Sequence, residues 1–260
     1  MITSPQNQHI KSIKHLQNRS KAREQQGAFV IEGIRLVEEA QRSGWDPELI
    51  IYSPDLDERG QAILNHFQQQ DIPVRKVTPE VMGAASDTHT PQRLLAVMPL
   101  RGQPQPQKLD FVIIADQIRD PGNLGTLLRT ALAAGADTVL MPPGTADPYS
   151  PKVIRGGMGA HFQLPLSKMS WEDIKTQLQG LTIYAAEVDA GLEYTQADLT
   201  QPLALIIGSE AWGAGDEARR LADRFLHIPM PGPTESLNAA VAGAVLTFEV
   251  VRQRRSTRHA

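Results

Sequence analysis

Three segments of this chain carry side chains that could do chemistry, and each one follows an apolar run. They span residues 116–136, 203–217 and 227–253. Their candidate side chains are Asn123, Arg129, Glu210, Ser236 and Asn238. Arginine, carboxylate and amide groups at the ends of apolar strands can bind an anion, orient a nucleophile or contact a ligand. The segments therefore predict a site built from three distant parts of the chain.

Each of these side chains also has a structural alternative. Arg129 lies at the edge of an apolar stripe with helical spacing, and this segment alone favours a surface arginine on an amphipathic helix over a ligand-binding residue. Glu210 and Asn238 each suit a helix cap as well as a ligand contact. Asn123 and Ser236 are placed as N-caps of the helices that follow them. The residues alone leave both interpretations open.

Glycines and prolines shape the loops around these candidates. Gly208, Gly213 and Gly215 follow an apolar run and allow backbone to approach a ligand closely. Neither a Walker loop nor a GxGxxG fingerprint is present, so the loops do not match a pyrophosphate site. The loop 228–235 is rich in proline, and such extended backbone can offer amide and carbonyl groups to a flat ring.

The elements that must position these loops alternate in type. Continuous apolar runs predict strands, and a long helix is expected from Leu237 to about Arg252. The expected strands are 111–115, 138–141, 182–186, 203–207 and 225–228. Runs buried on both faces are typical of parallel sheets covered by helices. The predicted fold is therefore α/β, with an open, mostly parallel sheet, helices on both faces, and ligands at the carboxyl ends of the strands.

A proline-rich stretch separates this sheet from a smaller α/β domain. We expect the smaller domain over 1–98, a linker over 99–107 and the main domain over 108–260. In the small domain the helices are expected at His9–Glu24, Ile34–Gln41 and Glu58–Gln69. Its strands are expected at 28–32, 49–52, 74–77 and 94–98. This alternation indicates an α/β sandwich.

Charge is unevenly distributed along the 260 residues, although the net charge is only −3. Basic residues exceed acidic ones by four in 1–35 and by four in 250–260, which leaves −11 on the rest. A basic end can bind phosphates or simply keep a helix face solvated. The chain has no cysteine, which excludes thiolate metal sites and a cysteine nucleophile. We expect a cytoplasmic protein with no membrane segment and no metal.

The three segments together resemble the SpoU (TrmH-like) family of RNA ribose 2′-O-methyltransferases, in the knotted SPOUT superfamily. The resemblance is carried by DPGNLGTLLRTALAAGA, IIGSEAWGAG and IPMPGPTESLNAAVAGAV, in that order. Residues 4–40 resemble the ribosomal-protein-like substrate-binding domain of members that modify ribosomal RNA. One departure is Ala211-Trp212, where the family more often has a glycine after the glutamate.

The resemblance implies a C-terminal trefoil knot, a homodimer packed through the catalytic domains, and S-adenosylmethionine as cofactor. By motif position it places catalytic roles on Asn123, Arg129, Glu210, Ser236 and Asn238. Cofactor binding falls on Ile207, Gly208, Ile228, Pro229, Met230 and Leu237. Basic residues of the first domain would contact RNA, most simply large-subunit ribosomal RNA: Lys11, Lys14, Arg19, Lys21, Arg23 and Arg35.

The implied reaction is methyl transfer to a ribose 2′-OH, which needs alignment and a route for the proton. Arginine is a poor base at neutral pH, so we expect Arg129 to grip a phosphate and polarise the hydroxyl. Alternatives are the same chemistry on transfer RNA, an inactive RNA-binding relic, and a nicotinamide-dependent enzyme. The missing GxGxxG and a missing ribose-binding acid disfavour the last.

Overall fold

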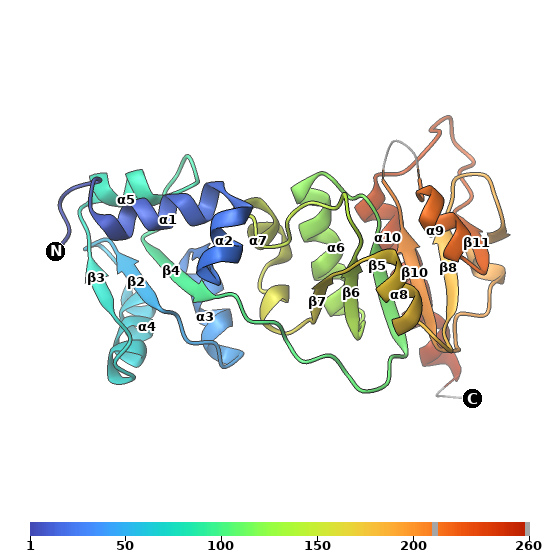
Figure 1. The fold of residues 1–260 in the computed structure, drawn as a ribbon, viewed down its shortest axis with the longest axis horizontal. Helices are drawn as coiled ribbons and strands as arrows, with labels where there is room; N and C mark the ends of the chain where they lie inside the picture. Colours follow the sequence, from blue (N-terminus) through green and yellow to red (C-terminus); the bar gives the residue numbers. More distant parts are fainter. Residues whose placement is uncertain (210–212, 258–260) are drawn as a thin grey trace. The chain divides into compact units, whose positions relative to one another are not determined.

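The structure is a computed structural model that describes residues 1–209 and 213–257. Contacts within the chain divide it into two compact units. Figure 1 colours the chain from blue at the N-terminus to red at the C-terminus. One unit holds Met1–Arg101 together with Tyr149–Phe162, and the other holds Gly102–Pro148 together with Gln163–Ala260. Each unit has its own sheet and its own buried core.

The N-terminal unit is built on a four-stranded sheet in the order β1-β4-β2-β3. Strand β4 pairs antiparallel with both β1 and β2, whereas β2 and β3 are parallel. The elements of this sheet and its helices are α1 (Gln8–Asn18), α2 (Ser20–Gln26), β1 (Ala28–Glu32), α3 (Ile34–Arg42), β2 (Leu49–Tyr52), α4 (Glu58–Gln69), β3 (Val74–Lys76), α5 (Pro79–Ala85) and β4 (Leu94–Pro99).

Helices cover both faces of this small sheet, as an α/β sandwich requires. Helices α1 and α5 pack on one face through residues such as Ile13 and Val81. Helices α3 and α4 pack on the other through residues such as Val37 and Phe67 (Figure 1). Because alternate residues of a strand point to opposite faces, β1 supplies both cores and is buried along its whole length.

The segment 149–162 also belongs to the N-terminal unit, which the division at residue 98 did not anticipate. It contains α7 (Pro151–Gly157) and the 3₁₀ helix η1 (Ala160–Phe162). Phe162 lies 5.3 Å from Trp45 between ring centroids, and its carbonyl accepts a hydrogen bond of 3.1 Å from Trp45 Nε1. An aromatic contact between positions so far apart leaves no periodic signal in the sequence.

The C-terminal unit is a seven-stranded sheet in the order β7-β6-β5-β10-β8-β11-β9, and its paired strands are parallel. Its elements are β5 (Phe111–Ala115), α6 (Pro121–Ala133), β6 (Thr138–Met141), β7 (Leu166–Lys168), α8 (Trp171–Gln177), β8 (Thr182–Ala186), β9 (Leu192–Glu193), the 3₁₀ helix η2 (Tyr194–Gln196), β10 (Leu203–Ile207), α9 (Asp216–Leu221), β11 (Arg224–His227) and α10 (Ala239–Thr257).

Helices cover both faces of this parallel sheet. Helices α8 and α9 pack through Ile174 and Ala218 against the face that carries Ile114 and Ile206. Helix α10 packs against α6 and β10 on the other face, where Gly243 lies beside Leu127 and Ile207. The predicted open parallel sheet with helices on both faces is therefore confirmed, and its loops gather at the carboxyl ends of the strands.

One predicted helix was wrong in its continuity. Residues 9–24 form two helices, because Arg19 between them takes an extended conformation with φ −133° and ψ 117°. The helix expected from Leu237 begins at Ala239 and continues to Thr257. Among the described residues, no helix is both long enough and apolar enough to span a membrane.

Candidate functional site

A pocket opens at the carboxyl ends of β8 and β10, between the loops that follow β10 and β11. Its walls are mainly apolar side chains and backbone, contributed by Ala186, Glu187, Val188, Ile207, Gly208, Ser209, Gly213, Leu226, Ile228, Met230, Ser236, Leu237, Ala239, Ala242 and Leu246. Five of the six residues expected to bind a cofactor line it, and Pro229 lines a second, adjoining hollow. The topology brings these expected residues together at one edge of the sheet.

The glycines after β10 allow the pocket wall to fold tightly. A Cβ on Gly208 would lie 2.2 Å from the carbonyl carbon and oxygen of Gly213. Ser209 and Gly213 exchange backbone hydrogen bonds of 2.9 and 3.0 Å, which hold this approach in place. Glu210 lies between them and is outside the described residues, so its expected role remains a prediction.

Asp116 fastens the far end of the same loop. Its Oδ2 accepts a hydrogen bond of 2.7 Å from the backbone N–H of Gly215. The side chain is buried, and Oδ1 has no hydrogen-bond partner among the described residues. Burial raises the pKa of Asp116 above its usual range, and the Gly215 hydrogen bond opposes this rise in pKa.

Asn123 and Asn238 meet across the site, although 115 positions separate them. Asn238 Nδ2 donates a hydrogen bond of 3.0 Å to Asn123 Oδ1. The assignments of Asn123 and Ser236 as N-caps were both wrong. Asp120, not Asn123, caps α6 by accepting from the Asn123 N–H at 3.0 Å. Asn238, not Ser236, accepts from the first N–H groups of α10, at 3.0 and 3.3 Å.

The other two expected catalytic residues occupy different places. Ser236 lines the pocket and is exposed. Arg129 lies on the exposed side of α6 and is not among the residues that line the pocket. Among the residues that the structure describes, the side chain of Arg129 has no hydrogen bond or ion pair, so its guanidinium is available to a ligand or a partner. The sequence analysis grouped Arg129 with the other candidates and did not predict that it lies outside the pocket lining.

Two charged residues at the pocket were missed by the sequence reasoning. Glu187 follows β8 and lines the pocket, and Arg219 Nη2 on α9 donates to its Oε2 at 3.0 Å. Arg219 Nε also donates to the carbonyl of Ala214 at 2.9 Å. Burial raises the pKa of Glu187, while Arg219 opposes this rise. The sequence did contain a signal for Glu187, because it is a carboxylate directly after an apolar strand. Its place at the pocket depends on the sheet order, which puts β8 beside β10.

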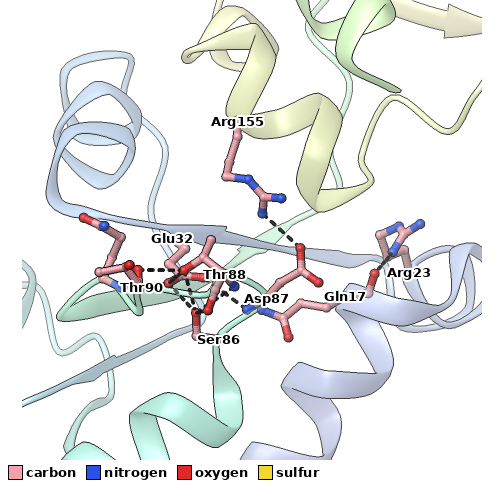
Figure 2. A network of polar contacts seen from close by, with 9 residues as sticks. Gln17, Arg23, Glu32, Ser86, Asp87, Thr88, Thr90 and Arg155 are labelled. Atoms are coloured by element: carbon pink, nitrogen blue, oxygen red, sulfur yellow. Dashed lines mark hydrogen bonds and ion pairs between the residues drawn. The ribbon is translucent and has the colours of Figure 1, made fainter. Parts of the chain in front are cut away.

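The basic residues expected to bind RNA divide into two groups. Lys11, Lys14, Arg19, Lys21 and Arg35 are exposed on the N-terminal unit. Arg23 is buried and donates to the carbonyls of Leu16 and Gln17 at the end of α1. Figure 2 shows Arg23 turned toward Gln17. The expectation for Arg23 was therefore wrong, because the unpaired carbonyls of a helix end need a donor.

A buried carboxylate organises the loop 86–92 of the same unit (Figure 2). Glu32 accepts hydrogen bonds from Ser86 Oγ at 2.7 Å and from the Gln92 N–H at 2.8 Å. Asp87 in this loop pairs with Arg155 of α7 at 3.0 Å. These contacts hold the loop against β1 and α7, and local periodicity does not reveal them.

The described residues contain no group of three or more His, Cys, Asp or Glu side chains placed to hold a metal ion. The site thus offers backbone, amide, hydroxyl and carboxylate groups around an apolar pocket. Such a pocket is typical of sites for small organic ligands. A parallel α/β sheet with this pocket at its carboxyl edge defines the class as an α/β ligand-binding enzyme fold.

Comparison with known families identifies the chain further. The SpoU rRNA Methylase family matches residues 110–248, and the MRM3-like substrate binding domain matches residues 7–96. The chain belongs to the SpoU rRNA methylase family. The family match spans the sheet and the pocket, and the second match spans the four-stranded N-terminal unit.

Similar proteins extend over nearly the whole chain. The 23S rRNA (guanosine(2553)-2′-O)-methyltransferase RlmP of Bacillus subtilis is 34% identical, with 96% of this chain and 98% of that protein covered. The 23S rRNA (uridine(2479)-2′-O)-methyltransferase of Streptomyces viridochromogenes is 30% identical, with 94% and 89% covered. The AdoMet-bound rRNA methyltransferase structure from Sinorhizobium meliloti has a TM-score of 0.86 at 30% identity, with 96% and 97% covered.

Proposed function

We propose that this protein transfers a methyl group from S-adenosylmethionine to a ribose 2′-OH of ribosomal RNA, most simply the large-subunit RNA. One observation carries the proposal. The three family segments converge on one edge of the parallel sheet, where the pocket adjoins the Asn123–Asn238 pair. Two relatives that match this chain over most of both lengths are named as 23S rRNA 2′-O-methyltransferases, which supports ribosomal RNA as the substrate.

The pocket fits an adenosine-type cofactor. Its apolar walls suit a flat base, and Gly208 and Gly213, which have no side chain, line it with backbone. We assign the binding to Ile207, Gly208, Ile228, Pro229, Met230 and Leu237. The cofactor supplies an electrophilic methyl group, and the chain supplies alignment. An AdoMet-bound relative with a TM-score of 0.86 supports this assignment.

The chain's polar residues would then position the ribose. Asn238 caps α10 and donates to Asn123, so the two amides hold each other at the N-terminal ends of α6 and α10. Ser236 presents a hydroxyl beside them. Arg129 stays charged at neutral pH, so in this proposal it grips the RNA phosphate and polarises the 2′-OH rather than removing its proton. Glu210 is the fifth residue of the proposed catalytic set.

The N-terminal unit would bind the RNA through its exposed basic residues. Lys11, Lys14, Arg19 and Lys21 lie on α1, α2 and the residue between them, and Arg35 lies in the first turn of α3. Cationic side chains that neutralise phosphates supply most non-specific RNA affinity, which falls as salt rises. The match of this unit to a substrate binding domain supports the assignment.

A homodimer packed through the catalytic units is the proposed assembly. Val241 and Phe248 lie seven positions apart on α10, so they share one face of that helix. They are 49% and 48% exposed, although both are large apolar side chains. The other residues of α10 between 239 and 251 are buried or half-buried, and an exposed apolar face on such a segment favours a protein partner.

We further propose a trefoil knot at the C-terminus, a cytoplasmic location, and functional domains over 1–98 and 108–260 joined by 99–107. The family resemblance supports the knot. The sheet order, in which β10 lies between β5 and β8, is compatible with it.

The proposal is tested by incubating the protein with labelled S-adenosylmethionine and ribosomal RNA from cells that lack it. We expect label at one alkali-resistant linkage in the large-subunit RNA and no label in DNA, which has no 2′-OH to accept the methyl group. Arg129→Ala and Arg129→Lys should retain cofactor binding and lose most turnover. Label in transfer RNA alone would show that transfer RNA, not ribosomal RNA, is the substrate. Cofactor binding without any turnover would favour an inactive RNA-binding relic.

A further inference from the structure

Glu187 lies where two hollows of different polarity meet. The pocket described above is mainly apolar, and it adjoins a second hollow lined by Asp189, Arg219, His227 and Glu235 among others. Glu187 lines both. It follows the last residue of β8 and therefore points from the carboxyl edge of the sheet, where parallel α/β folds bind ligands.

The carboxylate of Glu187 is held in one orientation and is incompletely paired. Arg219 Nη2 donates to Oε2 at 3.0 Å, and a Cβ on Gly213 would lie 3.2 Å from the same oxygen. Oε1 is buried and has no hydrogen-bond partner among the described residues, although Arg219 Nη2 lies 2.9 Å away with unsuitable geometry. A buried carboxylate oxygen without a donor is costly, so the site has capacity for a donor from a ligand.

The charge of this pair indicates what kind of donor fits. Arg219 already compensates the negative charge of Glu187 at contact distance. A second cation would therefore gain less than it would beside a lone carboxylate, whereas a neutral hydroxyl can satisfy Oε1. Carboxylates at strand ends of nucleotide-binding sheets commonly accept hydrogen bonds from ribose hydroxyls.

The order of polarity along the site matches the order of groups in the cofactor. S-adenosylmethionine carries a flat base, then a ribose, then a charged amino-acid end. The apolar pocket suits the base, and the polar hollow suits the charged end. Glu187 stands between them, at the place of the ribose.

We propose that Glu187, oriented by Arg219, accepts a hydrogen bond from the ribose hydroxyls of the cofactor. This inference rests on the proposed function, because it concerns the same pocket. Glu187 is thus a binding residue for the nucleoside part, and Arg219 is its positioning residue. Arg219 also holds the loop at Ala214, so it links the ribose contact to the pocket wall.

Calorimetric binding of S-adenosylhomocysteine and of its 2′,3′-dideoxyribose analogue tests the inference. Wild type should bind the dideoxy analogue about tenfold or more weakly than S-adenosylhomocysteine. Glu187→Gln should bind S-adenosylhomocysteine about tenfold more weakly and lose the difference between the two ligands, because the amide places a donor where Oε1 accepted. Glu193→Gln, a carboxylate outside both hollows, should behave as wild type.

Three results would overturn the assignment. An unchanged ratio between the two ligands in Glu187→Gln would remove the ribose contact while leaving the proposed function intact. If Glu187→Gln binds S-adenosylmethionine more weakly than wild type does but binds S-adenosylhomocysteine equally well, the carboxylate lies beside the sulfonium instead. Wild type that binds neither ligand would reject both this inference and the proposed function. If Glu187→Gln unfolds in a thermal scan, Glu187→Asp provides the same comparison with the charge retained.

Discussion

Arg23 and Lys21 lie two positions apart on α2, but their surroundings differ completely. Lys21 is exposed, while Arg23 is buried against the last turn of α1. The Arg23 guanidinium donates to the carbonyls of Leu16 and Gln17, which have no partner inside their own helix. Basic residues of one segment therefore serve folding at Arg23 and, in our proposal, RNA binding at the other positions.

Arg23→Ala should lower the free energy of unfolding by about 2–3 kcal/mol, because it removes charge-assisted hydrogen bonds and leaves buried carbonyls unpaired. Urea unfolding measures this change. Lys21→Ala is the matched control and should change the unfolding free energy by less than about 0.5 kcal/mol. Equal effects of the two substitutions on stability would contradict the structural role of Arg23.

Asp116 should make stability depend on pH in a defined direction. Burial raises the pKa of its carboxyl in the folded protein, so the folded state holds this proton to higher pH than the unfolded chain. Stability contributed by Asp116 therefore falls as pH rises from about 4, the ordinary value, through the raised pKa. The melting temperature of wild type minus that of Asp116→Asn should decrease over this range.

Asp198 provides the control of opposite sign. A hydrogen bond from the Thr200 hydroxyl lowers the pKa of its carboxyl, so its contribution to stability is present above about pH 4 and is lost as pH falls. The melting temperature of wild type minus that of Asp198→Asn should therefore increase with pH. A difference for Asp116→Asn that also increases with pH would show that its pKa is not raised.

The loop from β10 to α9 sets the shape of the pocket at the scale of elements. It is held at three places, by the Ser209–Gly213 backbone pair, by Asp116 on Gly215 and by Arg219 on Ala214. The partners come from β5, α9 and the loop itself. Strand order thus determines the pocket, because β5 and β8 flank β10 in the sheet.

Gly208→Ala should displace this loop. The added Cβ would lie 2.2 Å from the backbone of Gly213, and backbone cannot rotate away as a side chain can. We expect a loss of about 1–3 kcal/mol in stability and cofactor binding at least about tenfold weaker. Thermal unfolding and calorimetry measure the two effects.

Gly83→Ala is the control for the same chemical change. Gly83 lies in α5, and a Cβ there would meet nothing within 4 Å. Alanine is favoured over glycine inside a helix, so the free energy of unfolding of this variant should rise by up to about 1 kcal/mol. It should bind cofactor as wild type does. Intact cofactor binding by Gly208→Ala would mean that the tight approach does not shape the pocket.

At the scale of the whole molecule, charge and exposed apolar surface point to two different partners. The basic residues of the N-terminal unit would bind RNA, and the exposed face of α10 would bind a second copy of the chain. The net charge of −3 conceals this division, because a basic N-terminus is summed with an acidic body.

Phe248→Asp should convert the proposed dimer to a monomer. The substitution places a charge on an apolar face that would be buried between copies, where an unpaired charge is costly. Sedimentation equilibrium measures the mass. Leu192→Asp changes an exposed apolar residue on β9, outside the proposed α10 face, and should leave the dimer intact. A monomeric wild type, or an unchanged mass for Phe248→Asp, would reject this interface.

Much of the architecture could be predicted from the sequence because it depends on local patterns. The apolar runs 111–115, 138–141, 182–186 and 203–207 coincide with β5, β6, β8 and β10. A strand buried on both faces needs an uninterrupted apolar run, and that requirement is visible in the residues themselves. The loops after β5, β10 and β11 were also recognisable as the places where a site would form.

Only the tertiary structure decided which side chains meet. It paired Asn123 with Asn238, buried Arg23, fastened Asp116 to Gly215 and placed Glu187 at the pocket. It also packed residues 149–162 with the N-terminal unit. Each of these contacts joins groups through the order of strands or the packing of helices. Local spacing carries no record of that order, because the same pattern of strands can be arranged in many sheets.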